Sequence, residues 1–177
     1  VYFLRESREA ELVHDEQRLK QAMETKEREL DIMRRVDLTV VISENERKLL
    51  REYLPDAPMG VFPGLYAPIV EEPAPFATRK DIFFLGGFAH RPNVDAALWF
   101  SQEIWPLVRA RLPEASFHII GSEAPGKIKA LGSIPGVVVD GFVKDLDPLL
   151  SSIRLGVAPL RFGAGIKGKV AMTFGAG

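Results

Sequence analysis

The segment Gly163-Ala-Gly-Ile-Lys-Gly-Lys169 holds the residues whose types and spacing most clearly suggest chemistry. A glycine loop before a helix lets the backbone approach a ligand, and it presents unpaired N–H groups and the positive end of the helix dipole to an anion. Lys167 and Lys169 add positive charge, with Arg161 just upstream, and residues 154–177 contain no Asp or Glu. We therefore predict that this loop binds the phosphates of a ligand that carries a diphosphate.

The same segment matches two familiar phosphate-binding motifs only in part. Gly163, Gly165 and Gly168 spell the G-x-G-x-x-G of dinucleotide-binding domains, but they fall in the last strand-turn-helix unit, whereas the motif belongs to the first unit. The run up to Lys169 also spells G-x-x-x-x-G-K, but Val170 stands where a P-loop places the magnesium-binding Ser or Thr. An NAD-type dehydrogenase domain is therefore supported by the glycine spacing alone.

Glycines also follow three other predicted strands, in the turns 86–90, 121–122 and 141–143. Ligands of open parallel sheets bind outside the carboxyl ends of the strands, so four glycine turns at one edge predict a ligand crevice there. His90 lies in the first of these turns and is a candidate contact. The chain offers no Ser/His/Asp set and no convergent pair of carboxylates for hydrolysis, and its three scattered histidines do not predict a metal site.

Strands and helices alternate along the second half of the chain. The β-branched and aromatic runs predict strands over 82–85, 116–120, 137–140 and 155–159. Helical spacing of apolar residues predicts helices over about 94–112, 125–131 and 146–152, with a last helix opening near Ile166. Parallel neighbours need such crossovers, so we predict an α/β, Rossmann-like parallel sheet with helices on both faces.

The first part of the chain differs in texture. Residues 5–35 hold eight basic and nine acidic residues without Gly or Pro, which predicts one long charged helix, either solvated on the side of a domain or part of a dimerising coiled coil. A strand over 37–43, a helix capped by Ser43 and Glu46, and a strand over 59–62 follow. We expect residues 1–63 to form one part, 64–79 a proline-rich linker, and 80–177 the ligand-binding domain.

Composition excludes several classes of protein. The 177 residues carry 23 Lys and Arg against 24 Asp and Glu, so the chain lacks the basic surplus of a general nucleic-acid binder. Hydrophobic residues make up 46% of the chain, as in a globular protein, but no window is apolar enough for a transmembrane helix. Cysteine is absent, which fits a reducing compartment, and we expect a cytoplasmic protein. Both ends read as cuts in a longer protein.

Four blocks also carry a family resemblance. They are Phe84-Leu-Gly-Gly-Phe-Ala-His-Arg-Pro-Asn-Val-Asp-Ala-Ala-Leu-Trp-Phe100, Phe117-His-Ile-Ile-Gly-Ser122, Gly141-Phe-Val-Lys-Asp-Leu146 and Ala158-Pro-Leu-Arg-Phe-Gly-Ala-Gly-Ile-Lys-Gly-Lys-Val170. In order and spacing they resemble the C-terminal, donor-binding domain of family-four retaining glycosyltransferases with the GT-B fold, over roughly residues 80–177. Residues 1–63 resemble the end of that family's N-terminal, acceptor-side domain.

The resemblance implies a transferase of the hexosyl type, in carbohydrate biosynthesis, that binds a nucleotide-diphosphate sugar and transfers the sugar with retention. This fragment is expected to be inactive alone. No metal or further cofactor is implied, and the acceptor, whether glycan, lipid or protein, and a peripheral membrane contact stay open. The implied donor-binding residues are Gly86, Gly87, Phe88, His90, Arg91, Gly121, Phe142, Val143, Arg161, Gly163, Gly165, Lys167 and Lys169, whereas the catalytic residues stay unknown.

The sequence departs from the family's pattern at two glutamate positions and at one basic pair. Many members carry two glutamates around the last loop, where this chain has Ala164 and Met172. A basic pair that is usual after the first strand is replaced by Arg91-Pro-Asn93, which leaves Arg91 as the candidate. A non-catalytic GT-B-like module that binds a nucleotide diphosphate is therefore the alternative to an active transferase.

Overall fold

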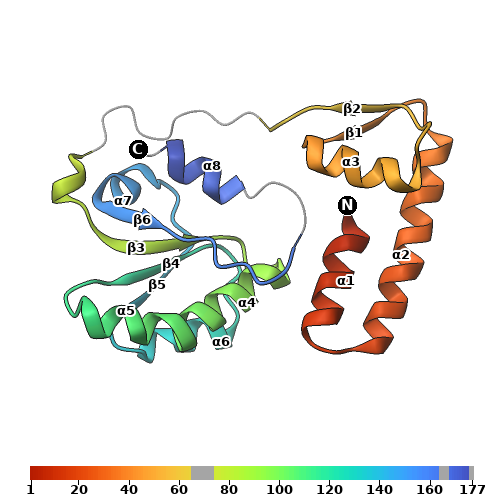
Figure 1. The fold of residues 1–177 in the computed structure, drawn as a ribbon. Coiled ribbons are helices and arrows are strands. Elements are labelled where there is room, and N and C mark those ends of the chain that lie inside the picture. The colour runs from red at the N-terminus through yellow and green to blue at the C-terminus, as the bar shows by residue number, and fades with distance from the viewer. Residues whose placement is uncertain (65–73, 164–167, 176–177) are drawn as a thin grey trace. The chain divides into compact units, whose positions relative to one another are not determined.

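The computed structural model describes residues 1–64, 74–163 and 168–175 (Figure 1). The chain divides into two compact units. The first comprises residues 1–65 with 162–166, and the second comprises residues 66–161 with 167–177. The expected linker over 64–79 lies mostly outside the described residues, and its described end holds a short 3-10 helix, η1 (Phe76–Thr78).

The first unit begins with a helical hairpin. The prediction of one helix over 5–35 is wrong, because the chain forms α1 (Tyr2–Leu12) and α2 (Glu16–Arg35), which lie side by side (Figure 1). His14 takes a left-handed φ of 53°, and the side chain of Asp15 caps α2 by accepting from Arg18 N at 3.0 Å. No Gly or Pro marks this break. Folding back buries Phe3, Ala10, Ala22 and Leu30.

A small strand-helix-strand motif completes the first unit. The strands β1 (Thr39–Val41) and β2 (Met59–Val61) pair in parallel, and α3 (Glu44–Tyr53) connects them. The predicted cap is confirmed, because Ser43 Oγ accepts from Glu46 N at 3.1 Å. The hydrophobic core of this motif and the end of α2 consists of Leu30, Val41, Leu50, Leu54 and Met59.

The second unit is built on the predicted parallel sheet. Its strands lie in the order β5-β4-β3-β6, and all neighbouring pairs are parallel. Their bounds are β3 (Lys80–Leu85), β4 (Phe117–Ile120), β5 (Val137–Gly141) and β6 (Ile153–Gly156). The strand predicted over 155–159 starts earlier, because Ile153 is already buried in a cluster with Phe83 and Ile120.

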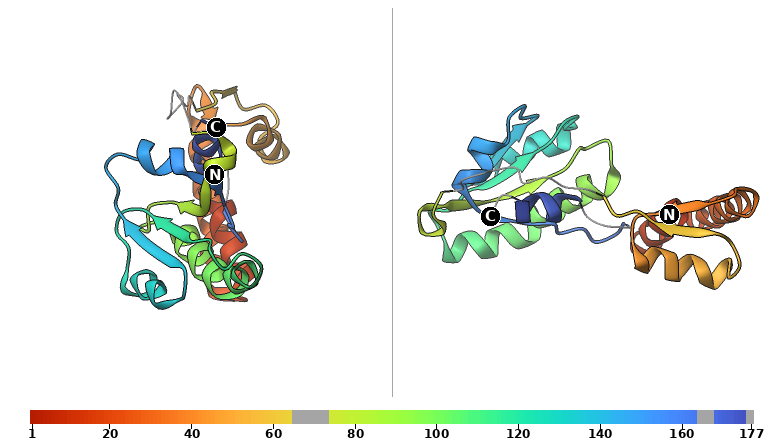
Figure 2. Two further views of the ribbon diagram at one scale, coloured as in Figure 1. Left: turned by 90° about the vertical axis from the view of Figure 1, so that its left-hand side faces the viewer. Right: turned by 90° about the horizontal axis from the view of Figure 1, so that it is seen from above.

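Helices cover both faces of this sheet, as predicted (Figures 1 and 2). On one face lie α4 (Arg91–Trp99), the π-helical turn η2 (Phe100–Ile104), α5 (Trp105–Arg111), α6 (Gly126–Lys129) and η3 (Ala130–Ser133). On the other face lie α7 (Asp147–Ser152) and α8 (Gly168–Gly175). The helix predicted over 94–112 thus contains a π-turn, which accommodates Pro106, a residue with no N–H for the α-helical ladder.

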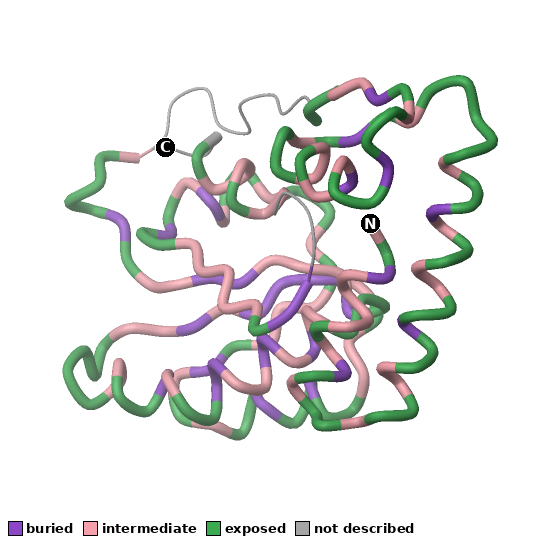
Figure 3. The backbone as a smooth tube through the Cα atoms, turned by 45° about the vertical axis from the view of Figure 1, so that its right-hand side comes forward, coloured by how far each residue is buried: buried purple, intermediate pink, exposed green. Residues whose placement is uncertain are grey.

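The core of the second unit fixes the strands relative to the helices. Trp105 is fully buried, and its indole Nε1 donates to the Pro135 carbonyl at 3.0 Å. The Phe117 ring lies between Phe100, at 4.6 Å, and Trp105, at 5.8 Å between ring centroids. Figure 3 shows buried residues along the central strands. Burying each such side chain contributes roughly 1.5–3 kcal/mol to the stability of this unit.

Candidate functional site

A cavity of about 390 Å³ opens at the carboxyl ends of β3, β4 and β5, where the glycine turns predict a ligand site. We call it the crevice. Backbone and apolar side chains form most of its wall, and the start of α8 closes one side. Its lining residues are Leu85, Gly86, Gly87, Ile120, Gly121, Ser122, Phe142, Val143, Leu146, Gly168, Lys169 and Met172.

Two glycines of the crevice are needed because neighbouring atoms leave no room for a side chain. A Cβ on Gly121 would lie 2.1 Å from the Gly86 carbonyl oxygen, and a Cβ on Gly86 would lie 2.7 Å from Asn93 Cγ. Backbone hydrogen bonds tie the turns together, from Gly86 N to Ile120 O at 2.9 Å and from Gly121 N to Gly141 O at 2.7 Å. The turns therefore form one rigid wall with little side-chain cover.

Lys169 is the cationic side chain of the described crevice wall. Its Nζ donates to Asn93 Oδ1 at 2.6 Å and lies 4.4 Å from the centroid of the Phe84 ring. The amide of Asn93 in turn donates from Nδ2 to the Gly87 carbonyl at 2.7 Å. Asn93 therefore joins the first glycine turn to α8 and holds the ammonium beside the crevice, a role that the sequence analysis missed.

The N-terminus of α8 also contributes to the crevice. Gly168 and Lys169 are its first two residues and both line the cavity. The first N–H groups of a helix have no intrahelical acceptors, and the helix dipole is positive at this end. This wall therefore suits an anionic group, as the glycine-lysine pattern predicts.

Arg161 is held in place rather than mobile. Its guanidinium pairs with both carboxylate oxygens of Asp95 on α4, with 2.9 Å from Nε to Oδ2, and lies 5.7 Å from the Trp99 ring centroid. The hydrogen bonds to Asp95 raise the pKa of Arg161 above its usual value, against the opposing effect of burial. The charge of Arg161 is thus paired with Asp95 in this structure.

Three candidates of the first turn do not contribute lining side chains. Phe88 is 5% exposed and its ring packs on Phe84, so it supports the wall beside Gly121 from within the core. His90 and Arg91 are exposed at the start of α4. Neither is among the described residues that line the crevice. The carbonyl of His90 accepts from Asn93 N at 3.0 Å, which orients the helix start.

The remaining candidates lie around the last loop and the third turn. Phe142 is 73% exposed on the rim of the crevice, beside Val143. Gly163 has a left-handed φ of 141° and groups with the first unit. Gly165 and Lys167 lie outside the described residues, as does Ala164, one of the two positions at which many family members carry a glutamate. Met172, the other glutamate position, is one of the residues that line the crevice.

A polar cluster lies in the middle of the sheet, away from the crevice. His118 on β4 lies between Asp140 on β5, with 3.0 Å from Nδ1 to Oδ2, and Asp81 at the start of β3, with 4.0 Å from Nε2 to Oδ2. His118 is therefore a hydrogen-bonded strand residue. Among the described residues, no cluster of His, Asp and Glu has the arrangement of a metal site.

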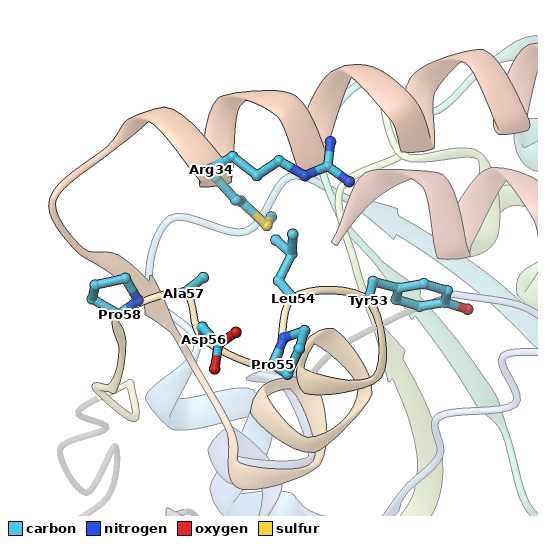
Figure 4. Close-up of a pocket in the computed structure, with 8 residues that line it drawn as sticks. Arg34, Tyr53, Leu54, Pro55, Asp56, Ala57 and Pro58 are labelled. Atoms are coloured by element: carbon cyan, nitrogen blue, oxygen red, sulfur yellow. The ribbon is translucent and has the colours of Figure 1, made fainter.

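A further cavity of about 420 Å³ lies in the first unit, between the end of α2 and the loop that follows α3 (Figure 4). Arg34, Tyr53 and the residues 54–58 line it together with Met33. Figure 4 shows the side chain of Leu54 pointing toward α2 and the ring of Tyr53 pointing away from the loop. No residue that the sequence analysis singled out for chemistry lies here.

No helix within the described ranges combines the length and the apolar character that crossing a membrane requires.

Comparison with protein families identifies the second unit. The sequence model described as "Glycosyl transferases group 1" matches residues 79–177, which include every wall of the crevice. This chain belongs to the group 1 glycosyl transferases. The coarser expectation of a glycosyltransferase is thereby confirmed, and the match begins at the residue before β3.

The fold agrees with that of a solved protein structure. The chain is similar to S. aureus TarM, crystallised as a point mutant in complex with Fondaparinux, alpha-GlcNAc-glycerol and UDP. The TM-score is 0.68 at 16% sequence identity, which confirms the α/β, GT-B-type fold of this group 1 member. The similarity covers 86% of this chain but 31% of the TarM chain, so the chain spans about a third of that protein. A comparison with curated proteins finds no match.

Proposed function

We propose that this group 1 glycosyl transferase binds a nucleotide-diphosphate sugar in the crevice, as the donor-binding part of an enzyme that transfers a hexose with retention. The observation that carries the proposal is the Lys169–Asn93–Gly87 network at the glycine wall. A bound diphosphate needs both close backbone approach and a fixed positive charge, and this network supplies the two together. The UDP in the TarM crystal supports a nucleoside diphosphate as the donor chemistry.

In the proposed reaction, the bond between the anomeric carbon of the sugar and the diphosphate oxygen breaks, and its electron pair stays on the diphosphate. The acceptor hydroxyl bonds to the same face of the anomeric carbon, and its proton passes to the departing diphosphate oxygen. The Lys169 ammonium and the first N–H groups of α8 stabilise the charge that develops on this leaving group. The protein thus acts through positioning and electrostatics.

By resemblance, Gly121 and the exposed Phe142 with Val143 border the base of the nucleotide. The wall at this end of the crevice is apolar, which suits the face of a base, and Lys169 lies on the α8 side. We therefore propose that the nucleoside lies toward Phe142 and the diphosphate toward α8. The bases differ little in their apolar faces, so this wall alone does not select among them.

The alternative function is binding of a nucleotide diphosphate without transfer. It is favoured by Met172, because a methionine is among the residues that line the crevice, at a position where many relatives have a glutamate. A thioether accepts hydrogen bonds only weakly, so it does not replace a carboxylate that binds sugar or ribose hydroxyls. Release of nucleoside diphosphate from a nucleotide sugar in the presence of acceptor distinguishes the two functions, since the alternative predicts binding without release.

A thermal-shift panel with UDP, GDP, TDP, ADP, NAD and Mg-ATP tests the proposed binding. A ligand at about 100 times its dissociation constant stabilises the folded state by roughly 2.7 kcal/mol, which raises Tm by several degrees. We expect a shift with one nucleoside diphosphate and none with NAD. Lys169→Ala should reduce this shift, whereas the exposed control Lys127→Ala on α6 should keep it. A panel without any shift, or a shift with NAD alone, contradicts the proposal.

A further inference from the structure

A cavity of about 450 Å³ lies at the opposite edge of the sheet from the crevice, at the amino ends of β3, β4 and β6. We call it the basic hollow. It is formed by the start of β3, the end of α5 with the loop 112–115, and one residue of β6. Its charged lining residues are the basic Arg79, Lys80, Arg111 and Arg154 and the acidic Asp81 and Glu114.

The acidic side chains offset only part of this charge, because two carboxylates face four basic residues. Asp81 is engaged by the protein itself, because its Oδ1 accepts from Ser116 N at 2.7 Å and its Oδ2 lies 4.0 Å from His118 Nε2. Glu114 is exposed on the loop and opposes four basic residues. The hollow therefore keeps a surplus of positive charge in a chain whose formal net charge is −1.

Two of the basic side chains are held by local contacts. Arg79 is only 6% exposed, and its Nε donates to the Ala74 carbonyl at 2.7 Å. The guanidinium of Arg154 lies 4.2 Å from the centroid of the Phe76 ring. Both cations are thus positioned before a ligand arrives, which reduces the entropy lost on binding.

The other two basic side chains, Lys80 and Arg111, are exposed at the mouth. Within the described residues, neither of them nor Arg154 forms an ion pair. Capping of the end of α5 does not account for Arg111, because Arg109 bridges that end to the next loop by donating from Nη1 to the Ala115 carbonyl at 2.6 Å.

We propose that the basic hollow binds a phosphate-bearing anion, at a site separate from the crevice. Its volume is within the range of small-ligand sites, and several converging cations suit the oxygens of a phosphate. Phe76 and Leu112 are 59% and 57% exposed beside these cations. An anionic lipid headgroup and a free phosphate compound share this chemistry, and the exposed apolar side chains match a headgroup at a membrane surface.

The test uses inorganic pyrophosphate as the free probe and vesicles of phosphatidylcholine with or without phosphatidylglycerol as the lipid probe. Calorimetry with pyrophosphate is done in the Lys169→Ala background, in which binding of pyrophosphate at the crevice is weakened. We expect Lys80→Ala with Arg111→Ala to weaken binding about tenfold or more, since two charge-assisted contacts are lost. The matched control, Lys127→Ala with Lys129→Ala, removes two exposed lysines of α6 and should bind like the parent.

Binding of pyrophosphate identifies a soluble ligand class, and binding of phosphatidylglycerol vesicles alone identifies a headgroup. Lys80→Arg with Arg111→Lys keeps both charges and should restore binding, which separates loss of charge from loss of folding. The proposal is overturned if the parent binds neither probe, or if the hollow variant and the α6 control bind alike. A parent that does not bind UDP contradicts the proposed function but leaves this comparison intact.

Discussion

At the scale of single residues, Asn93 is central because it contacts both sides of the proposed diphosphate site. Its amide accepts from Lys169 Nζ and donates to the Gly87 carbonyl. We expect Asn93→Ala and Lys169→Ala each to weaken binding of a nucleoside diphosphate, by about 1.5–3 kcal/mol for the lysine, and to leave nucleoside binding nearly unchanged. Calorimetric titrations with both ligands measure this.

A double-mutant cycle then tests whether Asn93 acts through Lys169. If Asn93 positions the ammonium, the two losses are not additive, and the coupling energy lies between about 0.5 and 3 kcal/mol. Equal loss of nucleoside and nucleoside diphosphate in Asn93→Ala would instead assign it a purely structural role.

Gly121 tests the rigidity of the crevice wall. A Cβ at this position lies 2.1 Å from a backbone oxygen that cannot rotate away, so Gly121→Ala must displace the Gly86 turn. We expect a loss of about 1–3 kcal/mol in the free energy of unfolding, typical of overpacking, together with weaker nucleotide binding. Gly126→Ala is the control, because a Cβ there meets nothing within 4 Å and alanine favours a helix. Urea unfolding of both variants decides the point.

At the scale of the elements, the sequence predicts a helix cap more accurately than the interruptions within the helices. Ser43 caps α3 as the sequence predicts, and Ser43→Ala should cost about 1 kcal/mol in the stability of that helix. Hydrogen exchange should show faster exchange of the first amides of α3, including that of Glu46. Ser133→Ala removes an exposed hydroxyl that accepts no cap hydrogen bond, and exchange in α3 should not respond to it. Equal exchange in Ser43→Ala and the parent would assign the cap no energetic role.

The strands and helices of the second unit follow from the sequence because their signals are local. Apolar runs and helical spacing predict all four strands of its sheet and the parallel pairing. The sequence does not indicate the break at residues 13–15, because the break is formed by an Asp cap and one left-handed histidine in a highly charged segment. Pro106 alone does not indicate the π-turn before it, because a proline is also tolerated in the first turn of an ordinary α-helix.

At the scale of the whole molecule, the sheet topology determines where the crevice lies, and contacts between residues far apart in the sequence fix its charged side chains. Because every strand of the sheet in the second unit is parallel, the glycine turns meet at one edge, and the crevice could be predicted. The pairs Lys169–Asn93 and Arg161–Asp95 join residues 76 and 66 positions apart, and no local pattern indicates them. Sequence reasoning therefore located the crevice but did not identify the partners that hold its charges.

The most direct test of the account is to map UDP binding on the backbone amide NMR spectrum of the protein. We predict the largest shift changes at Gly86, Gly87, Gly121 and Lys169, with smaller changes at Phe142. The signals of the control region, α6, should stay in place. Saturable changes confined to other parts of the chain, or a spectrum that UDP at high concentration leaves unaltered, would contradict the assignment of the crevice as the site of the donor diphosphate.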